Sequence, residues 1–383
     1  MKRNYIAKRF QNAGSGLTLD TEALAKYKDI IDLSIGDTDF ITDEGIINAA
    51  FRDAKAGYTR YGDPKGDPEL IDAVCRAWQE DFDQKLAHDH VLVSASSCLG
   101  MALVMLTILD PGDEVIVFSP YFPMYRSQIE LAGGVCVDVP TYASEDYAID
   151  EARLRAAITP RTKAIIFNNP TNPTGMAYGN DTLEMLAHVA KEYDLLIAAD
   201  EIYTTYLYEG DFRPLRTLPG MAERTITLNS FSKNFLMTGW RVGVIIAEPE
   251  LLEVMNDING SLIYTAPSIS QRAAIHALSM RREIREKYVT AYRDRIFYTA
   301  DRIEKIPYLS LVRPKGTFYL FPGIEKTGLT DDEFCNVLLD KAHVLVSHGK
   351  AFGTAGAGHF RIACTVGIDT LKIAFDRMEK LSF

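Results

Sequence analysis

The sequence predicts an α/β protein: a large domain with a mostly parallel sheet between helices, and a smaller α+β domain. The middle of the 383-residue chain alternates short apolar runs with helical patterns. From about residue 270 the pattern becomes long, charged and helical, and strands and helices then follow in blocks. Strands that alternate with helices are typical of a parallel sheet that is covered on both faces.

The elements follow from these patterns in order. Short apolar runs predict strands at 90–94, 113–118, 162–167, 195–199, 224–228 and 242–247. Helical periodicity predicts helices at 99–109 and 181–193, and one long helix over 270–306 with one or two weak breaks. Beyond it we expect strands at 308–312, 317–321 and 359–363, and a helix at 330–342. We therefore divide the chain into an N-terminal arm that joins the small domain (1–40), a large domain (41–280) and a small C-terminal domain (281–383).

Composition excludes several classes of partner. Lys and Arg number 41 against 52 Asp and Glu, which gives a net charge of −11 and argues against nucleic acid and anionic membranes. No apolar stretch approaches the roughly 20 residues of a membrane span, and no secretory signal is visible. The five cysteines are scattered and lack a CxxC spacing. We expect reduced thiols, a cytoplasmic protein and no metal site.

The segment 230–233 places a lysine beside two serines, and Arg241 follows eight residues later. A lysine such as Lys233 forms a Schiff base with a carbonyl group when its surroundings keep the amine deprotonated. Serine and arginine side chains, here Ser230, Ser232 and Arg241, are natural phosphate ligands. The alternative is a surface loop with a solvated lysine and a structural arginine.

Polar residues also follow other predicted strands. Asp200 ends an apolar strand, where open α/β sheets place ligand-binding groups. A lysine combined with an aspartate that pairs with a pyridinium nitrogen is the pattern of pyridoxal phosphate sites, although Asp200 could instead cap the next helix. Asn172 lies in a turn-rich loop after a further strand. Ser97 and Cys98 lie among small residues between a strand and a helix, where backbone amides can approach an anion.

The ordered set of segments resembles the class I/II aminotransferases of the fold-type I pyridoxal phosphate enzymes. The resemblance runs across nearly the whole chain. Its segments are Ser-Ile-Gly-Asp-Thr-Asp-Phe at 34–40, Tyr61, Asp-Pro-Gly-Asp-Glu-Val at 110–115, Ser-Pro-Tyr-Phe-Pro-Met-Tyr at 119–125, Asn-Pro-Thr-Gly at 172–175, Asp200-Glu201 with Tyr203, Ser-Phe-Ser-Lys at 230–233, Gly-Trp-Arg-Val-Gly at 239–243, and Arg361. It implies a pyridoxal 5′-phosphate cofactor and the transfer of an α-amino group from an amino acid to a 2-oxo acid in a ping-pong reaction.

The resemblance also implies roles for individual residues. Lys233 would hold the cofactor as a Schiff base and move a proton, and Asp200 would pair with the ring nitrogen. Asn172 and Tyr203 would bind the phenolic oxygen of the ring. Phe122 would stack on the ring, with plain core packing as the alternative.

The remaining roles concern two anions. The phosphate would be held by Ser230, Ser232, Arg241 and the backbone amides of Ser97 and Cys98. Tyr61 would reach the phosphate of a neighbouring subunit, which implies a homodimer with shared active sites; the alternative is a structural tyrosine. The substrate α-carboxylate would bind Arg361 as a bidentate fork and lie close to the backbone at Gly36.

Two departures from the family pattern bear on the substrate. Cys98 stands where some aspartate-specific relatives carry a lysine that reads the distal carboxylate, so we expect aromatic or broadly neutral amino acids. His348 replaces a proline; we expect it in a surface loop, with a place at the substrate entrance as the alternative. A β-lyase or another pyridoxal phosphate enzyme on the same scaffold is the alternative function. A non-catalytic regulator is disfavoured, because the lysine is kept and the chain leaves no room for a DNA-binding head.

Overall fold

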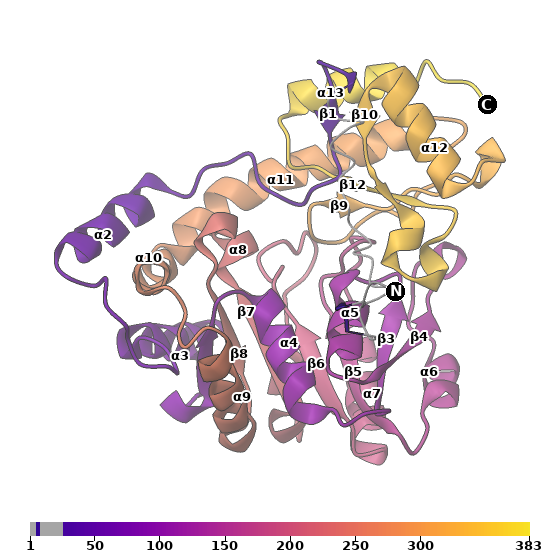
Figure 1. Ribbon diagram of the computed structural model, residues 1–383. Helices are drawn as coiled ribbons and strands as arrows, with labels where there is room; N and C mark the ends of the chain where they lie inside the picture. Colours follow the sequence, from indigo (N-terminus) through magenta and orange to yellow (C-terminus); the bar gives the residue numbers. More distant parts are fainter. Residues whose placement is uncertain (1–4, 8–25) are drawn as a thin grey trace.

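The computed structural model describes residues 5–7 and 26–383, and a seven-stranded sheet forms its centre (Figure 1). The strand order is β2-β8-β7-β6-β5-β3-β4, and β8 is antiparallel to both of its neighbours while the pairs from β7 to β4 are parallel. These strands are β2 (Val91–Ser94), β3 (Glu114–Ser119), β4 (Val135–Pro140), β5 (Thr162–Asn168), β6 (Leu196–Asp200), β7 (Thr225–Ser230) and β8 (Gly243–Ile246). The mostly parallel sheet of the sequence prediction is confirmed.

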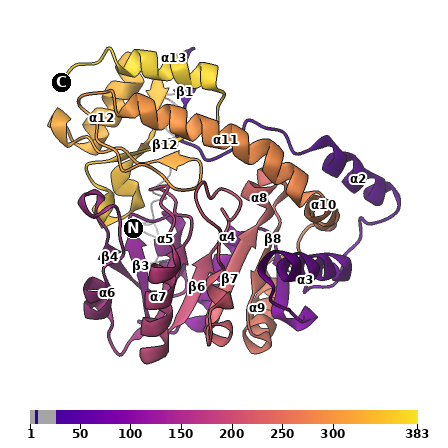
Figure 2. The same cartoon turned by 180° about the vertical axis from the view of Figure 1, so that it is seen from behind.

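Helices cover both faces of this sheet, as Figures 1 and 2 show from opposite sides. Alternate residues of β3 point to opposite faces: Val115 and Val117 pack with one apolar cluster, and Ile116 packs with another. The covering helices are α3 (Pro68–Phe82), α4 (Ser97–Ile108), α5 (Met124–Leu131), α6 (Glu151–Ala157), α7 (Asn180–Glu192) and α9 (Pro249–Leu262). α2 (Glu44–Lys55) lies farther out and packs against the helix Ser268–Ser279 (Figure 1). The sheet is therefore buried between two helical layers.

The predicted long helix is two helices in the structure. α10 (Ser268–Ser279) ends at Met280, and α11 (Arg281–Ile303) begins directly after it. The Met280 amide closes the end of α10 by donating to the carbonyls of His276 and Ala277. α11 then runs from the sheet to the smaller unit, as Figure 1 shows.

The smaller unit combines short strands with helices at the far end of α11. β11 (Ser347–His348), β12 (Phe360–Ala363) and β9 (Tyr319–Leu320) form an antiparallel sheet. β1 (Ile31–Asp32) pairs with β10 (Val344–Leu345), so the segment around residue 31 lies beside the C-terminal part of the chain. The helices are α12 (Asp331–Val337) and α13 (Ile368–Met378). The domain boundaries at 40 and 280 stay predictions.

Two predictions in this unit need correction. The expected strand at 308–312 does not form, because neighbouring side chains Tyr308 and Leu309 both enter the core, whereas a strand would place them on opposite faces. Only Ser310 makes an isolated bridge, with Gly323. The helix expected at 330–342 is α12 followed by a turn of π-helix over Leu338–Ala342.

Within residues 5–7 and 26–383, no helix combines the length and the apolar composition that crossing a membrane requires.

Candidate functional site

A cavity of about 1010 Å³ lies where the carboxyl ends of the central strands meet the smaller unit. Open α/β sheets bind ligands at this end of their strands. Every predicted site residue except Tyr61 lines it: Gly36, Ser97, Cys98, Phe122, Asn172, Asp200, Tyr203, Ser230, Ser232, Lys233, Arg241 and Arg361. Residues far apart in the sequence thus share one space.

Lys233 lies on α8 (Phe231–Asn234), a short helix that begins directly after β7. Ser230 caps this helix, because its Oγ accepts a hydrogen bond from the Ser232 amide at 3.1 Å. The Lys233 ammonium donates to the Gly36 carbonyl and forms no ion pair with a described carboxylate. A lysine amine without a counter-ion is free to react with a carbonyl group that enters the cavity.

Asp200 is a buried carboxylate at the end of β6, with an exposed fraction of 7%. Its Oδ2 accepts a hydrogen bond from the Tyr125 hydroxyl, and its Oδ1 has no partner in the described part of the chain. Burial raises the pKa of Asp200 to about 6, although the hydrogen bond from Tyr125 opposes that rise. An oxygen left in this state is a natural partner for a cationic N–H group of a ligand.

The N-terminus of α4 supplies an anion site at the edge of the cavity. Ser96 caps the helix with its Oγ, which accepts from the Leu99 amide at 3.2 Å. The amides of Ser97 and Cys98 lie in the first turn, where helix N–H groups lack intrahelical partners. A Cβ on Gly243 would lie 2.7 Å from the Ser97 nitrogen, so only glycine lets β8 approach this turn so closely.

Arg241 completes the anion site from the loop that follows α8. Its side chain is exposed, and Nη1 donates to the Thr238 carbonyl at 2.7 Å. No carboxylate within the described ranges forms an ion pair with its guanidinium. With Ser230 and Ser232 on the same cavity wall, the group can bind a phosphate.

Arg361 is a second arginine without a counter-ion, and only 3% of its surface is exposed. Nη1 donates to Asn172 Oδ1 at 3.0 Å, and Nη2 donates to the Ser34 carbonyl at 2.5 Å. The buried Nε has no partner in the described part. The pKa of Arg361 lies below its ordinary value because burial penalises its charge. Such a guanidinium fits a carboxylate ligand.

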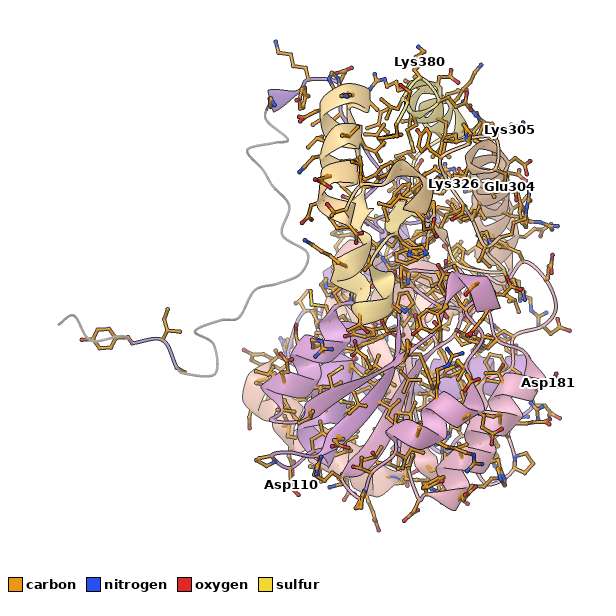
Figure 3. All side chains as sticks on the ribbon, turned by 90° about the vertical axis from the view of Figure 1, so that its right-hand side faces the viewer. Asp110, Asp181, Glu304, Lys305, Lys326 and Lys380 are labelled. Carbon is orange, nitrogen blue, oxygen red and sulfur yellow. The ribbon has the colours of Figure 1, made fainter. Side chains whose placement is uncertain are left out.

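Charged side chains on the outside of the molecule are in a different situation. Asp110 and Asp181 point outward from the larger unit in Figure 3, and Lys305 and Lys380 point outward from the smaller one. Water solvates these groups, whereas the buried charge of Arg361 needs polar partners inside the cavity in place of water.

Four aromatic residues line the cavity: Phe122, Tyr125, Tyr203 and Tyr319. The hydroxyl of Tyr203 is 3.1 Å from that of Tyr319. Phe122 is half-buried, and its ring centroid lies 5.7 Å from that of Tyr125. The backbone of Asn172 is fixed by a hydrogen bond, because its amide donates to Asn168 Oδ1 at 2.8 Å.

The structure adds functional residues that sequence reasoning missed. Tyr125 and Tyr319 contact Asp200 and Tyr203, and Gln128 Nε2 donates to the Cys98 carbonyl at 2.8 Å. Tyr125 does stand in the segment 119–125 that carries the family resemblance, but no pattern there joins it to Asp200. No signal in the sequence marks Tyr319.

His348 lines the cavity and is not part of a purely surface loop. Its Nδ1 lies 2.8 Å from Asp332 Oδ1, and the Lys350 ammonium pairs with the other oxygen of the same carboxylate. The alternative reading, a place at the cavity entrance, is therefore the one that the geometry favours.

Tyr61 lies apart from the cavity. It is 85% exposed, and its ring packs edge-on against Tyr264 at a centroid distance of 5.3 Å. Tyr58, Leu262 and Ile263 are also exposed. Tyr61 therefore does not line the cavity of its own chain.

The cavity fits pyridoxal phosphate. The unpartnered Asp200 Oδ1 matches a protonated ring nitrogen, the start of α4 with Arg241 matches a phosphate, and Lys233 matches an aldehyde. Arg361 then remains for a second anion.

Comparisons with known proteins agree with this chemistry. Residues 28–378 match the family model of class I and II aminotransferases. An aspartate aminotransferase of Pyrococcus abyssi is 37% identical over 93% of this chain and 92% of its own length. An aromatic-amino-acid aminotransferase of Thermococcus litoralis is 36% identical over 92% of this chain and 91% of its own. The structure of the Thermus thermophilus aspartate aminotransferase with maleate matches with a TM-score of 0.93 at 32% identity, and covers 99% of this chain and 100% of that one.

Proposed function

The chain belongs to the class I and II aminotransferases and is a pyridoxal phosphate-dependent enzyme, and we propose which of its residues carry the reaction. It transfers an amino group from an amino acid to a 2-oxo acid. The two half-reactions of a ping-pong cycle would use the same cavity in turn. The named relatives include aspartate and aromatic-amino-acid aminotransferases, so the alternative of a β-lyase gains no support.

Pyridoxal phosphate supplies a reactive carbonyl and a ring that withdraws electrons from an attached carbon. Lys233 binds at that carbonyl and, once released, holds and moves a proton with its Nζ. The contact with the Gly36 carbonyl supports this role, since it keeps Nζ inside the cavity. Asp200 keeps the ring nitrogen protonated through Oδ1, its free oxygen.

Two anion sites orient the reactants. Arg241, Ser230, Ser232 and the first turn of α4 hold the phosphate. Arg361 holds the α-carboxylate of the substrate beside Gly36 and Asn172, and its lack of a described carboxylate partner supports this role. Tyr203 and Asn172 bind the ring oxygen, and Phe122 packs on the ring face.

The substrate side chain is proposed to be aromatic or otherwise neutral. Cys98 lies at the cavity wall where a lysine would serve an acidic substrate. After Lys233, Arg241 and Arg361, Lys350 is the one remaining lysine or arginine among the described lining residues, and Asp332 already neutralises it. The names of the relatives include both aspartate and aromatic aminotransferases, so they do not decide between these substrates.

We also propose a homodimer in which Tyr61 completes the phosphate site of the partner subunit. Its 85% exposure and its distance from its own cavity support this arrangement. For the compartment we propose the cytoplasm, because all five cysteines are free thiols.

One observation carries the assignment: a carboxylate oxygen of Asp200 and a guanidinium nitrogen of Arg361 are buried without described partners at the same cavity as Lys233. Purified protein should show visible absorption from bound cofactor that changes when an amino donor is added. Donors tested against 2-oxoglutarate would then rank aromatic, neutral and acidic side chains. If Lys233→Ala kept this absorption and turned over at the wild-type rate, the assignment of Lys233 would be wrong.

A further inference from the structure

Tyr319 is the residue at which the smaller unit meets the reacting end of the cavity. It lies on β9, is 2% exposed, and lines the cavity together with Arg361 and Tyr203. β9 pairs with β12, the strand that carries Arg361. Tyr203 and Lys233 follow strands of the central sheet, so Tyr319 reaches across from one unit to the other.

The side chain of Tyr319 contacts three functional groups at once. The Arg361 guanidinium lies over its ring at 4.6 Å from the centroid. Its hydroxyl oxygen is 3.1 Å from that of Tyr203. The same hydroxyl packs closely against Gly36, where a Cβ would lie 1.8 Å from the Tyr319 oxygen. The Gly36 carbonyl accepts a hydrogen bond from the Lys233 ammonium.

We propose that Tyr319 is a positioning residue that links carboxylate binding at Arg361 to the hydrogen bond that Tyr203 gives the cofactor. The inference rests on the roles proposed above for Arg361 and Tyr203. It goes beyond them because it names the group through which one site affects the other.

The direction of the hydrogen bond follows from a count of protons. A phenol has one proton to donate. If Tyr203 donates its proton to the ring oxygen of the cofactor, its own oxygen must accept the proton of Tyr319. Burial, and next to it the neighbouring Tyr319, hold the pKa of Tyr203 well above its ordinary value, so Tyr203 keeps a proton to donate.

The strength of this donation depends on Arg361. A cation over an aromatic ring draws on the electrons of its face, which makes the Tyr319 hydroxyl a stronger donor. A carboxylate that binds Arg361 neutralises this cation and weakens the chain from Tyr319 to Tyr203. The ring oxygen then receives a weaker hydrogen bond, and the nitrogen that joins Lys233 to the cofactor holds its proton up to a higher pH.

The test is a pH titration of the visible absorption of the loaded enzyme with and without propionate, which carries a carboxylate and no amino group. The midpoint is the pH at which half of the change in absorption has occurred. In wild type, saturating propionate should raise this midpoint. Tyr319→Phe keeps the ring under Arg361 and removes only the hydroxyl. We expect its midpoint without propionate to be higher by about 0.4 to 1 pH unit, the effect of one neutral hydrogen bond, and to respond less to propionate.

Tyr208→Phe is the matched control. Tyr208 is also a buried tyrosine, and its hydroxyl donates to the carbonyl of Thr317, two residues before Tyr319. Tyr208 itself does not line the cavity. The titration midpoint of Tyr208→Phe, and the shift that propionate causes in it, should equal those of wild type. Thermal unfolding of each variant would confirm that it is folded.

The outcomes separate this inference from the proposed function. A wild-type midpoint that does not move with propionate would overturn the role of Arg361 and, with it, the link. A wild-type shift that persists at full size in Tyr319→Phe would overturn the link alone and leave the role of Arg361 intact. A reduced shift in Tyr319→Phe together with a full shift in Tyr208→Phe supports the link.

Discussion

The Tyr125 hydroxyl donates to Oδ2 of Asp200 and leaves Oδ1 as the only free oxygen of this buried carboxylate. The two residues are 75 positions apart, on α5 and at the end of β6. A hydrogen bond to the charged form favours ionisation, so Tyr125 opposes the effect of burial on Asp200. Tyr125 thus both orients the carboxylate and helps to keep it charged.

Replacing Tyr125 with Phe should shift the acid limb of the pH profile of cofactor binding upward. Without its donor, the pKa of Asp200 rises above about 6, and the carboxylate protonates at a higher pH. A hydrogen bond to a charged group is worth roughly 1 to 2 pH units on this limb. The measurement is the affinity of the cofactor-free protein for pyridoxal phosphate between pH 5 and pH 9, because the pKa of about 6 belongs to the carboxylate before the cofactor binds.

Tyr178→Phe serves as the control for this change. Tyr178 is a tyrosine whose hydroxyl donates to the Tyr147 carbonyl at 2.9 Å, and it does not line the main cavity. Its acid limb should stay where it is in wild type. An unmoved limb in Tyr125→Phe would show that Tyr125 does not tune Asp200.

Arg361→Lys should weaken the binding of every substrate, because all of them share the α-carboxylate. A lysine cannot offer two parallel N–H groups, and it would abandon at least one of the contacts to Asn172 and Ser34. Loss of one charge-assisted hydrogen bond predicts kcat/KM lower by about 10- to 100-fold for amino acids and 2-oxo acids alike. Cofactor absorption should persist. Arg313→Lys, at an exposed ion pair with Glu304, should change neither value.

Gly243→Ala should weaken cofactor binding through the phosphate site. The new Cβ would lie 2.7 Å from the Ser97 nitrogen and 3.0 Å from the Asn229 carbonyl oxygen, so the first turn of α4 must move. Overpacking of this kind costs about 1 to 3 kcal/mol, which corresponds to a roughly 5- to 150-fold higher cofactor Kd. Gly239→Ala is the control, because Gly239 lies in the loop just before β8 and a Cβ there meets nothing within 4 Å. Equal cofactor affinity in the two variants would contradict a phosphate site at this turn.

Glu201→Gln should flatten the dependence of stability on pH. Glu201 is buried, its Oε1 accepts from the Leu215 amide at 2.9 Å, and burial raises its pKa to about 8. In the unfolded chain the value is about 4.3. The neutral form therefore stabilises the fold fully below the unfolded value, and this contribution is lost as pH rises through about 8.

The measurement for Glu201 is the Tm of the loaded enzyme from pH 5 to pH 9. Wild type should lose Tm toward alkaline pH more steeply than Glu201→Gln. Glu253→Gln, at an exposed position of α9, should keep the wild-type slope. Parallel curves for wild type and Glu201→Gln would mean that Glu201 does not titrate in this range.

Sequence reasoning located most of the site because its residues follow strands. Lys233 and Asp200 stand at strand ends, and parallel strands bring such ends to one edge, so periodicity alone indicated that they would meet. The roles of Arg361 and Asn172 came from the family resemblance, and the structure places both on the cavity.

The remaining contacts join residues that no local pattern connects. Tyr319 and Tyr203 are 116 positions apart, and their approach depends on how the smaller unit meets the sheet. The weak breaks in the pattern over 270–306 did not point to Met280, because the residues on both sides of it favour helix. The predicted strand at 308–312 failed for a tertiary reason: the core takes two adjacent side chains.

If Tyr61 completes the site of the partner subunit, two inactive variants should restore activity when they form mixed dimers. In the test, Lys233→Ala chains are mixed with Tyr61→Ala chains and the subunits are allowed to exchange. If Tyr61 serves the partner, each mixed dimer holds one cavity with Lys233 from one chain and Tyr61 from the other, and that cavity is intact. With half of the dimers mixed, activity should return to about a quarter of the wild-type value.

The same mixture separates the alternatives for Tyr61. If Tyr61 acted within its own chain, the cavity that keeps Lys233 would still lack its tyrosine, and mixing would add no activity. Its 85% exposure and its contact with the exposed Tyr264 favour the shared arrangement. Lys233→Ala mixed with Tyr58→Ala is the control, because Tyr58 is less exposed and its ring already packs under the Arg272 guanidinium at 4.1 Å. The Tyr58→Ala homodimer should be active before mixing, whereas the Tyr61→Ala homodimer should gain activity only through exchange.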